Sequence, residues 1–75
     1  MMIQKRFQLK RKNIAIVQFI IEAYEGMATV STIDPRLAII QISIMKNFVS
    51  PMENVIEYLK NRYELEEIVK YPLNQ

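Results

Sequence analysis

Cysteine and histidine are both absent from this 75-residue chain, and glycine occurs once. The lack of cysteine excludes disulfides and thiolate metal sites. The lack of histidine removes the commonest general base and the commonest ligand for transition metals. A single glycine cannot build a glycine-rich phosphate loop. The sequence therefore predicts no catalytic residue, no metal and no cofactor, and we expect a protein that is not an enzyme on its own.

A long apolar run and a strong net charge are also missing. The longest apolar stretch, residues 14–24, is interrupted by Gln18 and Glu22, and it is far shorter than the roughly 20 residues of a membrane-spanning helix. No secretory signal is recognisable at the N-terminus, because no small-residue cleavage site follows its charged stretch. A formal net charge of +2 is too small to indicate nucleic acid by itself. We expect a cytoplasmic protein with no membrane contact.

The apolar pattern predicts one domain, residues 1–75, with a small core, because 51% of the residues are hydrophobic and a second core has no room. Four segments have the alternation or the β-branched content of strands. They are residues 3–11, 27–33, 37–45 and 67–72. Two segments have the periodicity of amphipathic helices. They are residues 13–25 and 50–64.

Start and stop signals accompany both predicted helices. The side chain of Asn13 is expected to cap the first helix, and Gly26 is expected to close it in the left-handed conformation. Ser50, Pro51 and Glu53 have the spacing of a cap, a first helical residue and a capping-box acid. These signals predict the start of the second helix at Ser50.

The order β-α-β-β-α-β predicts an α+β ferredoxin-like sandwich. Its four-stranded antiparallel sheet would have the strand order 4-1-3-2, with both helices on one face. A turn is predicted between the second and third strands at Asp34-Pro35-Arg36, since Asp suits the first turn position and Pro the second. This topology gathers distant charges at the two ends of the sheet.

One end of the predicted sheet is basic. Free amides at the start of the first helix, together with cations, suit an anion such as a phosphate, a carboxylate metabolite or a nucleic-acid backbone. The alternative is ordinary solubilising charge, because Glu64 and two nearby glutamates dilute the positive field. The candidate anion-binding residues are Lys10, Arg11, Lys12 and Arg36.

The other end holds Glu22 and Glu25, at the terminus of the first helix where the helix dipole disfavours negative charge. We expect Lys5, Arg6 or Lys46 to offset this cost. Two carboxylates three residues apart could bind a hard cation or do acid–base work. The alternative is a solvated acidic stripe with loose ion pairs.

The first helix has a wider apolar face than packing on one sheet requires, with Phe19 at its margin. We expect the second helix, a partner or both to cover it. The sheet face away from the helices has the mixed composition of either an open face or a homodimer face. An RNA-binding sheet is disfavoured there, because that mode needs aromatic residues on the central strands. The expected members of this face are Gln4, Arg6, Gln8, Met27, Thr29, Ser31, Ile33, Ile39, Gln41, Ser43 and Met45.

The stretch FIIEAYEGMATVSTIDPRLAIIQISI is similar to the characteristic sequence of a family of short bacterial proteins, the domain of unknown function 4911. The resemblance covers about half of the chain and implies no activity. Its structural motif is Tyr24, Gly26, Asp34 and Pro35. The other matching positions are Glu22, Ala23, Glu25 and Thr32.

We therefore expect a small binding or regulatory module that forms a homodimer and engages a partner protein or a small anion. A small enzyme or cation site at Glu22 and Glu25 is one alternative. Another is a nucleic-acid-associated protein that uses the basic N-terminal strand, although we expect nucleic acid to be a less suitable partner. The cations available for that role are Lys5, Arg6, Lys10, Arg11, Lys12 and Arg36.

Overall fold

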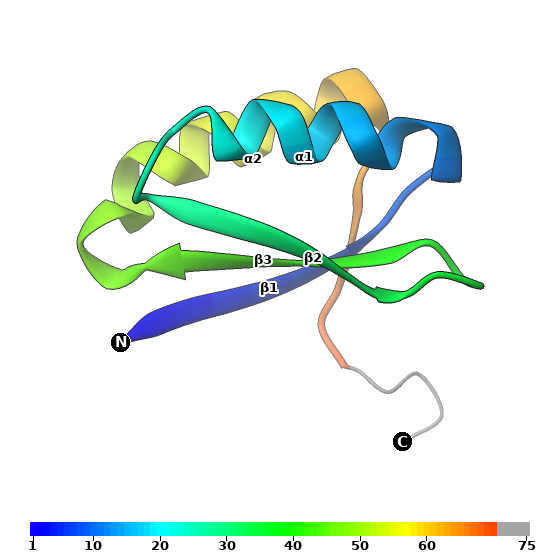
Figure 1. Cartoon of the computed structure of the whole chain (residues 1–75), viewed down its shortest axis with the longest axis horizontal. Coiled ribbons are helices and arrows are strands. Elements are labelled where there is room, and N and C mark those ends of the chain that lie inside the picture. The colour runs from blue at the N-terminus through cyan, green and yellow to red at the C-terminus, as the bar shows by residue number, and fades with distance from the viewer. Residues whose placement is uncertain (71–75) are drawn as a thin grey trace.

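A computed structural model of the chain describes residues 1–70. Its elements follow the predicted order, with a short 3-10 turn before each helix (Figure 1). The strands are β1 (Met2–Gln8), β2 (Ala28–Asp34), β3 (Ile39–Met45) and β4 (Glu66–Ile68). The helices are α1 (Ile14–Glu22) and α2 (Val49–Tyr63), and the 3-10 turns are η1 (Arg11–Asn13) and η2 (Lys46–Phe48).

The four strands form one antiparallel sheet in the order β2-β3-β1-β4, and both helices cover the same face (Figure 1). The predicted ferredoxin-like topology is therefore confirmed. The edge position of β4 is also confirmed, whereas Tyr71 and Pro72 of the predicted last strand lie outside the described residues. Neither helix within residues 1–70 is long and apolar enough to cross a membrane.

The core lies between the sheet and the helices. Phe7 is fully buried on the central strand β1 and lies opposite Ile40 of β3, as the inward side of the predicted alternation requires. Helix α1 contributes the buried Val17 and Ile21. The remaining buried members of this cluster are Leu9, Ala28, Val30, Ile42, Ile44, Met52, Ile56, Leu59 and Leu65.

The face away from the helices is less open than predicted. Ile39 is fully buried and Ser43 is 9% exposed, although both were expected on a mixed surface. Met27 was also expected there, but it packs against the core because it precedes β2 in the connecting turn. The Arg6 Nε–H donates to Gln41 Oε1 at 3.0 Å across the paired strands β1 and β3. This polar pair occupies part of the face that an RNA or a second sheet would need.

The end of α1 differs from the prediction, because the helix stops at Glu22 rather than Glu25. A tight turn follows, in which the Met27 N–H donates to the Tyr24 carbonyl at 3.0 Å. Gly26 occupies the third position of this turn with φ +79°, which only glycine adopts without strain. The left-handed glycine is thus confirmed, but it closes the turn after the helix and not the helix itself.

Neither predicted helix cap forms. Asn13 directly precedes α1 but makes no side-chain capping bond, because η1 leads into the helix and the Asn13 N–H donates to the Lys10 carbonyl. Helix α2 begins at Val49, so the predicted cap Ser50 lies inside the helix, and Pro51 is its third residue and not its first. Pro51 therefore lies within the first turn of α2. The N–H groups of a first turn have no acceptor within the helix, so a proline there costs no helical hydrogen bond.

The predicted turn between β2 and β3 is confirmed. Asp34 Oδ1 accepts a hydrogen bond from the Leu37 N–H at 3.1 Å, the contact expected of Asp at the first turn position. Ala38, just after the turn, adopts a left-handed φ of 57°, and no sequence signal indicated this conformation. The turn lies at the same end of the sheet as η1, so it helps to form the basic end (Figure 1).

Candidate functional site

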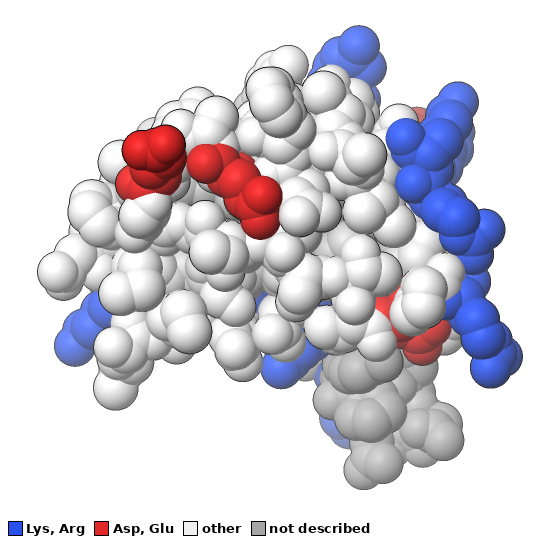
Figure 2. Space-filling view, in the orientation of Figure 1, with Lys and Arg blue, Asp and Glu red and all other residues white. Residues whose placement is uncertain are grey.

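The topology brings all four candidate anion-binding cations to one end of the molecule. Figure 2 shows Lys and Arg side chains in a band along the right-hand edge, where Figure 1 places η1 and the β2–β3 turn. The Arg11 Nη2 donates to the carbonyls of Pro35 and Arg36, both at 2.9 Å. Arg11 therefore connects the segment before α1 to the turn.

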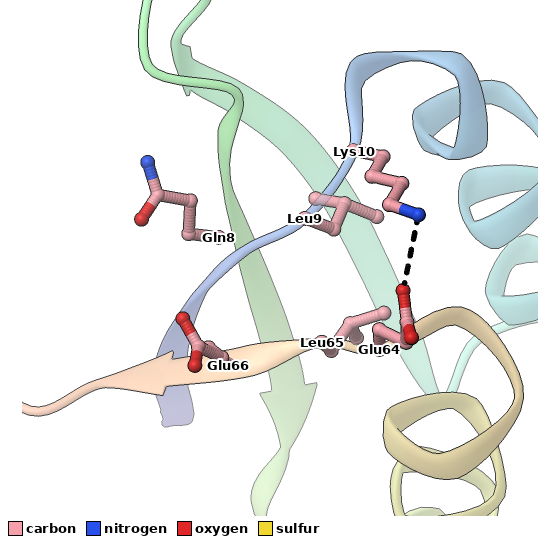
Figure 3. Close-up of a pocket in the computed structure, with 6 residues that line it drawn as sticks. All are labelled: Gln8, Leu9, Lys10, Glu64, Leu65 and Glu66. Atoms are coloured by element: carbon pink, nitrogen blue, oxygen red, sulfur yellow. Dashed lines mark ion pairs between the residues drawn. The ribbon is translucent and has the colours of Figure 1, made fainter.

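Two of the four cations are already engaged within the protein. Arg11 binds the turn carbonyls, and Lys10 Nζ lies 3.3 Å from Glu64 Oε1. The ion pair bridges a depression between the end of β1 and the start of β4 (Figure 3). The N–H groups of Asn13 and Ile14 are also engaged, because they donate to the carbonyls of Lys10 and Arg11. Of the four candidate cations, Lys12 and Arg36 form no hydrogen bond or ion pair through their side chains among residues 1–70.

Replacing Arg11 with Met should lower the free energy of unfolding by about 1 kcal/mol, since the variant loses two hydrogen bonds from a charged donor at an exposed position. Lys12→Met is the matched control, because it removes the same charge where no hydrogen bond or ion pair is present among residues 1–70. Urea denaturation measures both. Equal stability of the two variants would show that the contacts to the turn contribute nothing.

The acidic end forms, but without the expected cations. Among residues 1–70, no ion pair involves Glu22 or Glu25, and Glu22 only accepts a 3.4 Å hydrogen bond from Gln18 Nε2. Arg6, expected to offset these glutamates, is instead bonded to Gln41 on the opposite face of the sheet. The earlier end of α1 also leaves Glu25 outside the helix. None of Lys5, Arg6 and Lys46 forms a direct ion pair with either glutamate among residues 1–70.

A metal at this acidic end has little to hold it. Within residues 1–70 no group of three or more acidic side chains comes close enough to bind an ion. Two exposed carboxylates supply too few of the six to eight oxygen ligands that Ca²⁺ takes. The pair Glu22 and Glu25 is thus better described as an acidic surface than as a metal centre.

Sequence reasoning missed a cleft of about 340 Å³ between α2 and the strands β1 and β4. The available signal was Lys5, which interrupts the inward side of β1 between the apolar positions of the alternation. The cleft is lined by two lysines and three glutamates, so its charge is mixed. Lys60 Nζ lies 4.0 Å from Glu57 Oε1, one turn earlier on α2. The polar lining residues are Lys5, Glu53, Asn54, Glu57, Lys60 and Glu67.

Exposed apolar side chains lie on α1. Phe19 is 71% exposed and Ile16 is 39% exposed. At about 100° per residue, Ile16 lies on the flank of α1 opposite Gln18 and Glu22. Figure 2 shows acidic side chains over the C-terminal end of α1 on the near face, and Figure 1 places α2 behind α1. The flank with Ile16 therefore turns toward α2, and Phe19 projects from the top of the helix layer.

Helix α2 adds one aromatic side chain to this surface. Glu57 and Lys60 line the cleft beside β4, so their flank of α2 faces away from α1. Tyr58, which is 55% exposed, lies on the other flank and points toward α1. We name Ile16, Phe19 and Tyr58 the helix-layer patch. The predicted excess of apolar surface on α1 is confirmed, and the second helix covers only part of it.

Comparison with known proteins gives one match. A family model described as a domain of unknown function (DUF4911) matches residues 7–62, from the buried Phe7 to the last turn of α2. No curated protein and no solved structure matches the chain. The matched segment includes the turn glycine, the Asp-Pro turn and both helices, and it covers well over half of the chain. The protein therefore belongs to the DUF4911 family.

Proposed function

We propose that this protein is a non-catalytic interaction module that self-associates and binds a partner protein through its helix layer. The observation that carries the proposal is the exposure of the helix-layer patch, whose members Phe19, Tyr58 and Ile16 are 71%, 55% and 39% exposed. Aromatic residues are enriched in the centres of protein interfaces. Contiguous exposed apolar patches mark protein-interaction or ligand-binding sites.

The chemistry of the chain supports binding rather than catalysis. It has neither histidine nor cysteine, so no usual base or nucleophile accompanies its exposed carboxylates. The mixed charges of the cleft beside β4 favour neither an anion nor a cation. A small anion at the basic end is less well supported, because Lys10 and Arg11 are engaged by Glu64 and the turn carbonyls. We propose the cytoplasm as its location, with which the lack of cysteine agrees.

A photoreactive residue tests the patch in the native host. Placed at Phe19, it should cross-link one discrete protein, whereas at Gln18, on the polar flank of the same helix, it should cross-link none. The captured protein, once purified, should bind the chain at least tenfold more weakly when Phe19→Glu is introduced. The substitution should change the free energy of unfolding by less than about 0.5 kcal/mol, because the side chain is exposed.

Two results would contradict the proposed function. Cross-linking at Gln18 as strong as at Phe19 would mean that the patch is not selective. Equal affinity of the captured protein for the native chain and for Phe19→Glu would mean that the contact is incidental.

A further inference from the structure

The two edges of the sheet are protected to different degrees. Natural proteins guard edge strands with charges, proline or short length. Strand β4 has only three described residues, Glu66–Ile68, and two of them are glutamates. Strand β2 is the other edge, and residues 28–33 contain no charge and no proline. Its outer side pairs with no strand among residues 1–70, so it is the edge open to another chain.

The hydrogen-bonding pattern identifies which backbone groups of β2 are free. The Met45 N–H donates to the Met27 carbonyl at 2.9 Å, so Met27 directs its backbone groups toward β3. Along an antiparallel strand, successive residues direct their backbone N–H and carbonyl groups alternately to one neighbour and to the other. Thr29 and Ser31 therefore also face β3, and the N–H and carbonyl groups of Ala28, Val30 and Thr32 point outward. These are the groups that an added strand would bond.

The surface on the β2 side is acidic at one end and basic at the other. Figure 1 draws β2 and α1 nearest the viewer, so Figure 2 looks onto this side. Figure 2 shows two acidic groups at the upper left and most of the basic side chains at the right, with one more acidic group at the lower right and further basic groups at the lower left. Among residues 1–70, Glu22, Glu25, Lys12 and Arg36 form no ion pair. If a second copy is related to the first by a two-fold axis perpendicular to the sheet, the acidic end of each copy lies opposite the basic end of the other.

We infer that two copies of this chain pair antiparallel through their β2 edges and cross near Thr32. The position follows from the charges. The acidic end leads directly into Ala28, and the bonds from Arg11 fix the basic end at Pro35 and Arg36. Thr32 is the midpoint between Ala28 and Arg36, so crossing there places the acidic end of each copy against the basic end of the other.

The hydrogen-bonding pattern agrees with this position. Thr32 directs its backbone groups outward, so it can lie on the two-fold axis and bond its own counterpart. The bulge between Thr32 and Asp34 keeps the shared ladder short. Crossing at Val30 is less favourable, because it moves the two acidic ends closer together and each acidic end away from the basic end of the other copy.

The inference rests on the self-association proposed above and adds its geometry. An antiparallel two-fold pairing continues the sheet across both copies, so both helix layers lie on the same side. The two helix-layer patches would then face the same direction and could contact one partner together, which strengthens binding without any new contact.

A single introduced cysteine tests the crossing point, since the chain has no cysteine of its own. Oxidised Thr32→Cys should form a covalent dimer, because facing residues of a hydrogen-bonded antiparallel pair lie about 5.5 Å apart between Cα atoms, within disulfide reach. Thr29→Cys is the control, because Thr29 is also an exposed residue of the same strand. In the inferred pairing the two Thr29 residues are about 20 Å apart. We expect Thr32→Cys to cross-link at least tenfold faster.

The outcomes separate this geometry from self-association itself. Sedimentation of the native chain is measured alongside, and urea denaturation shows that both variants fold. If the native chain is a dimer but Thr29→Cys links as fast as Thr32→Cys, the β2 pairing is overturned and self-association is not. The sheet face away from the helices would then be the better candidate for the dimer contact. A chain that sediments as a monomer and links slowly at both positions would overturn the geometry and the self-association together.

Discussion

Replacing Phe7 with Ala should lower the free energy of unfolding by about 3–5 kcal/mol, the range found when a buried Phe is replaced by Ala. Phe7 is fully buried on a central strand, between Ile40 of β3 and Glu67 of β4. Its ring packs in the single core that both helices and three strands share. The loss combines the transfer of the ring to water with an unfilled cavity, because neighbouring strands cannot close around a missing side chain.

The effect is large relative to the whole domain. A chain of 75 residues has a stability of roughly 4–11 kcal/mol at 0.05–0.15 kcal/mol per residue. Phe7→Ala should therefore unfold well below the native chain's melting temperature. Phe19→Ala is the matched control, because it is the same chemical change at a side chain that is 71% exposed. Equal loss of stability in the two variants, measured by urea denaturation, would contradict the assignment of the core.

Charge reversal at one end of the β2 side should weaken the dimer about tenfold or more. Glu22→Lys with Glu25→Lys makes both ends of that side basic, and Lys12→Glu with Arg36→Glu makes both ends acidic. Each exposed attraction is worth about 0.2–1 kcal/mol and becomes a repulsion of similar size. The two-fold axis repeats both contacts, so four contacts each change by about 0.4–2 kcal/mol, and the total is at least about 1.6 kcal/mol.

Mixing the two double variants provides the decisive comparison. Each should be mostly monomeric alone, whereas an equimolar mixture should associate, because the acidic ends of one variant then meet the basic ends of the other. Sedimentation measures all three samples at low salt, and 1 M salt should diminish the differences. A mixture that associates no better than its components would mean that these four residues do not lie in the interface.

The fold could be predicted because its signals are periodic and extend over whole segments. Alternation in β1 and helical spacing in α2 each persist over many residues, so single exceptions such as Lys5 do not change the assignment. Helix ends depend on one or two residues, and other structure competes for them. The Asn13 cap is replaced by η1, and η2 moves the start of α2 to Val49. The capping signals were present, but they did not decide the structure.

The candidate sites could be located from the sequence, but their internal contacts could not. Topology predicts that Lys10, Lys12 and Arg36 share one end of the sheet, because it depends only on the order of the elements. Arg11 was expected to bind a ligand, yet it binds the carbonyls of the turn, and no residue type signals which acceptor a long flexible side chain selects. The absence of cations beside Glu22 likewise follows from side-chain direction and not from sequence spacing.

The central claim is that two copies of this chain associate. Sedimentation equilibrium over a wide range of concentrations, at low salt, tests it most directly. We predict a mass that rises with concentration from one chain of 8.9 kDa toward twice that value. A mass of one chain at every concentration would contradict the claim, and the β2 edge would then have to be explained as a solvent-exposed strand.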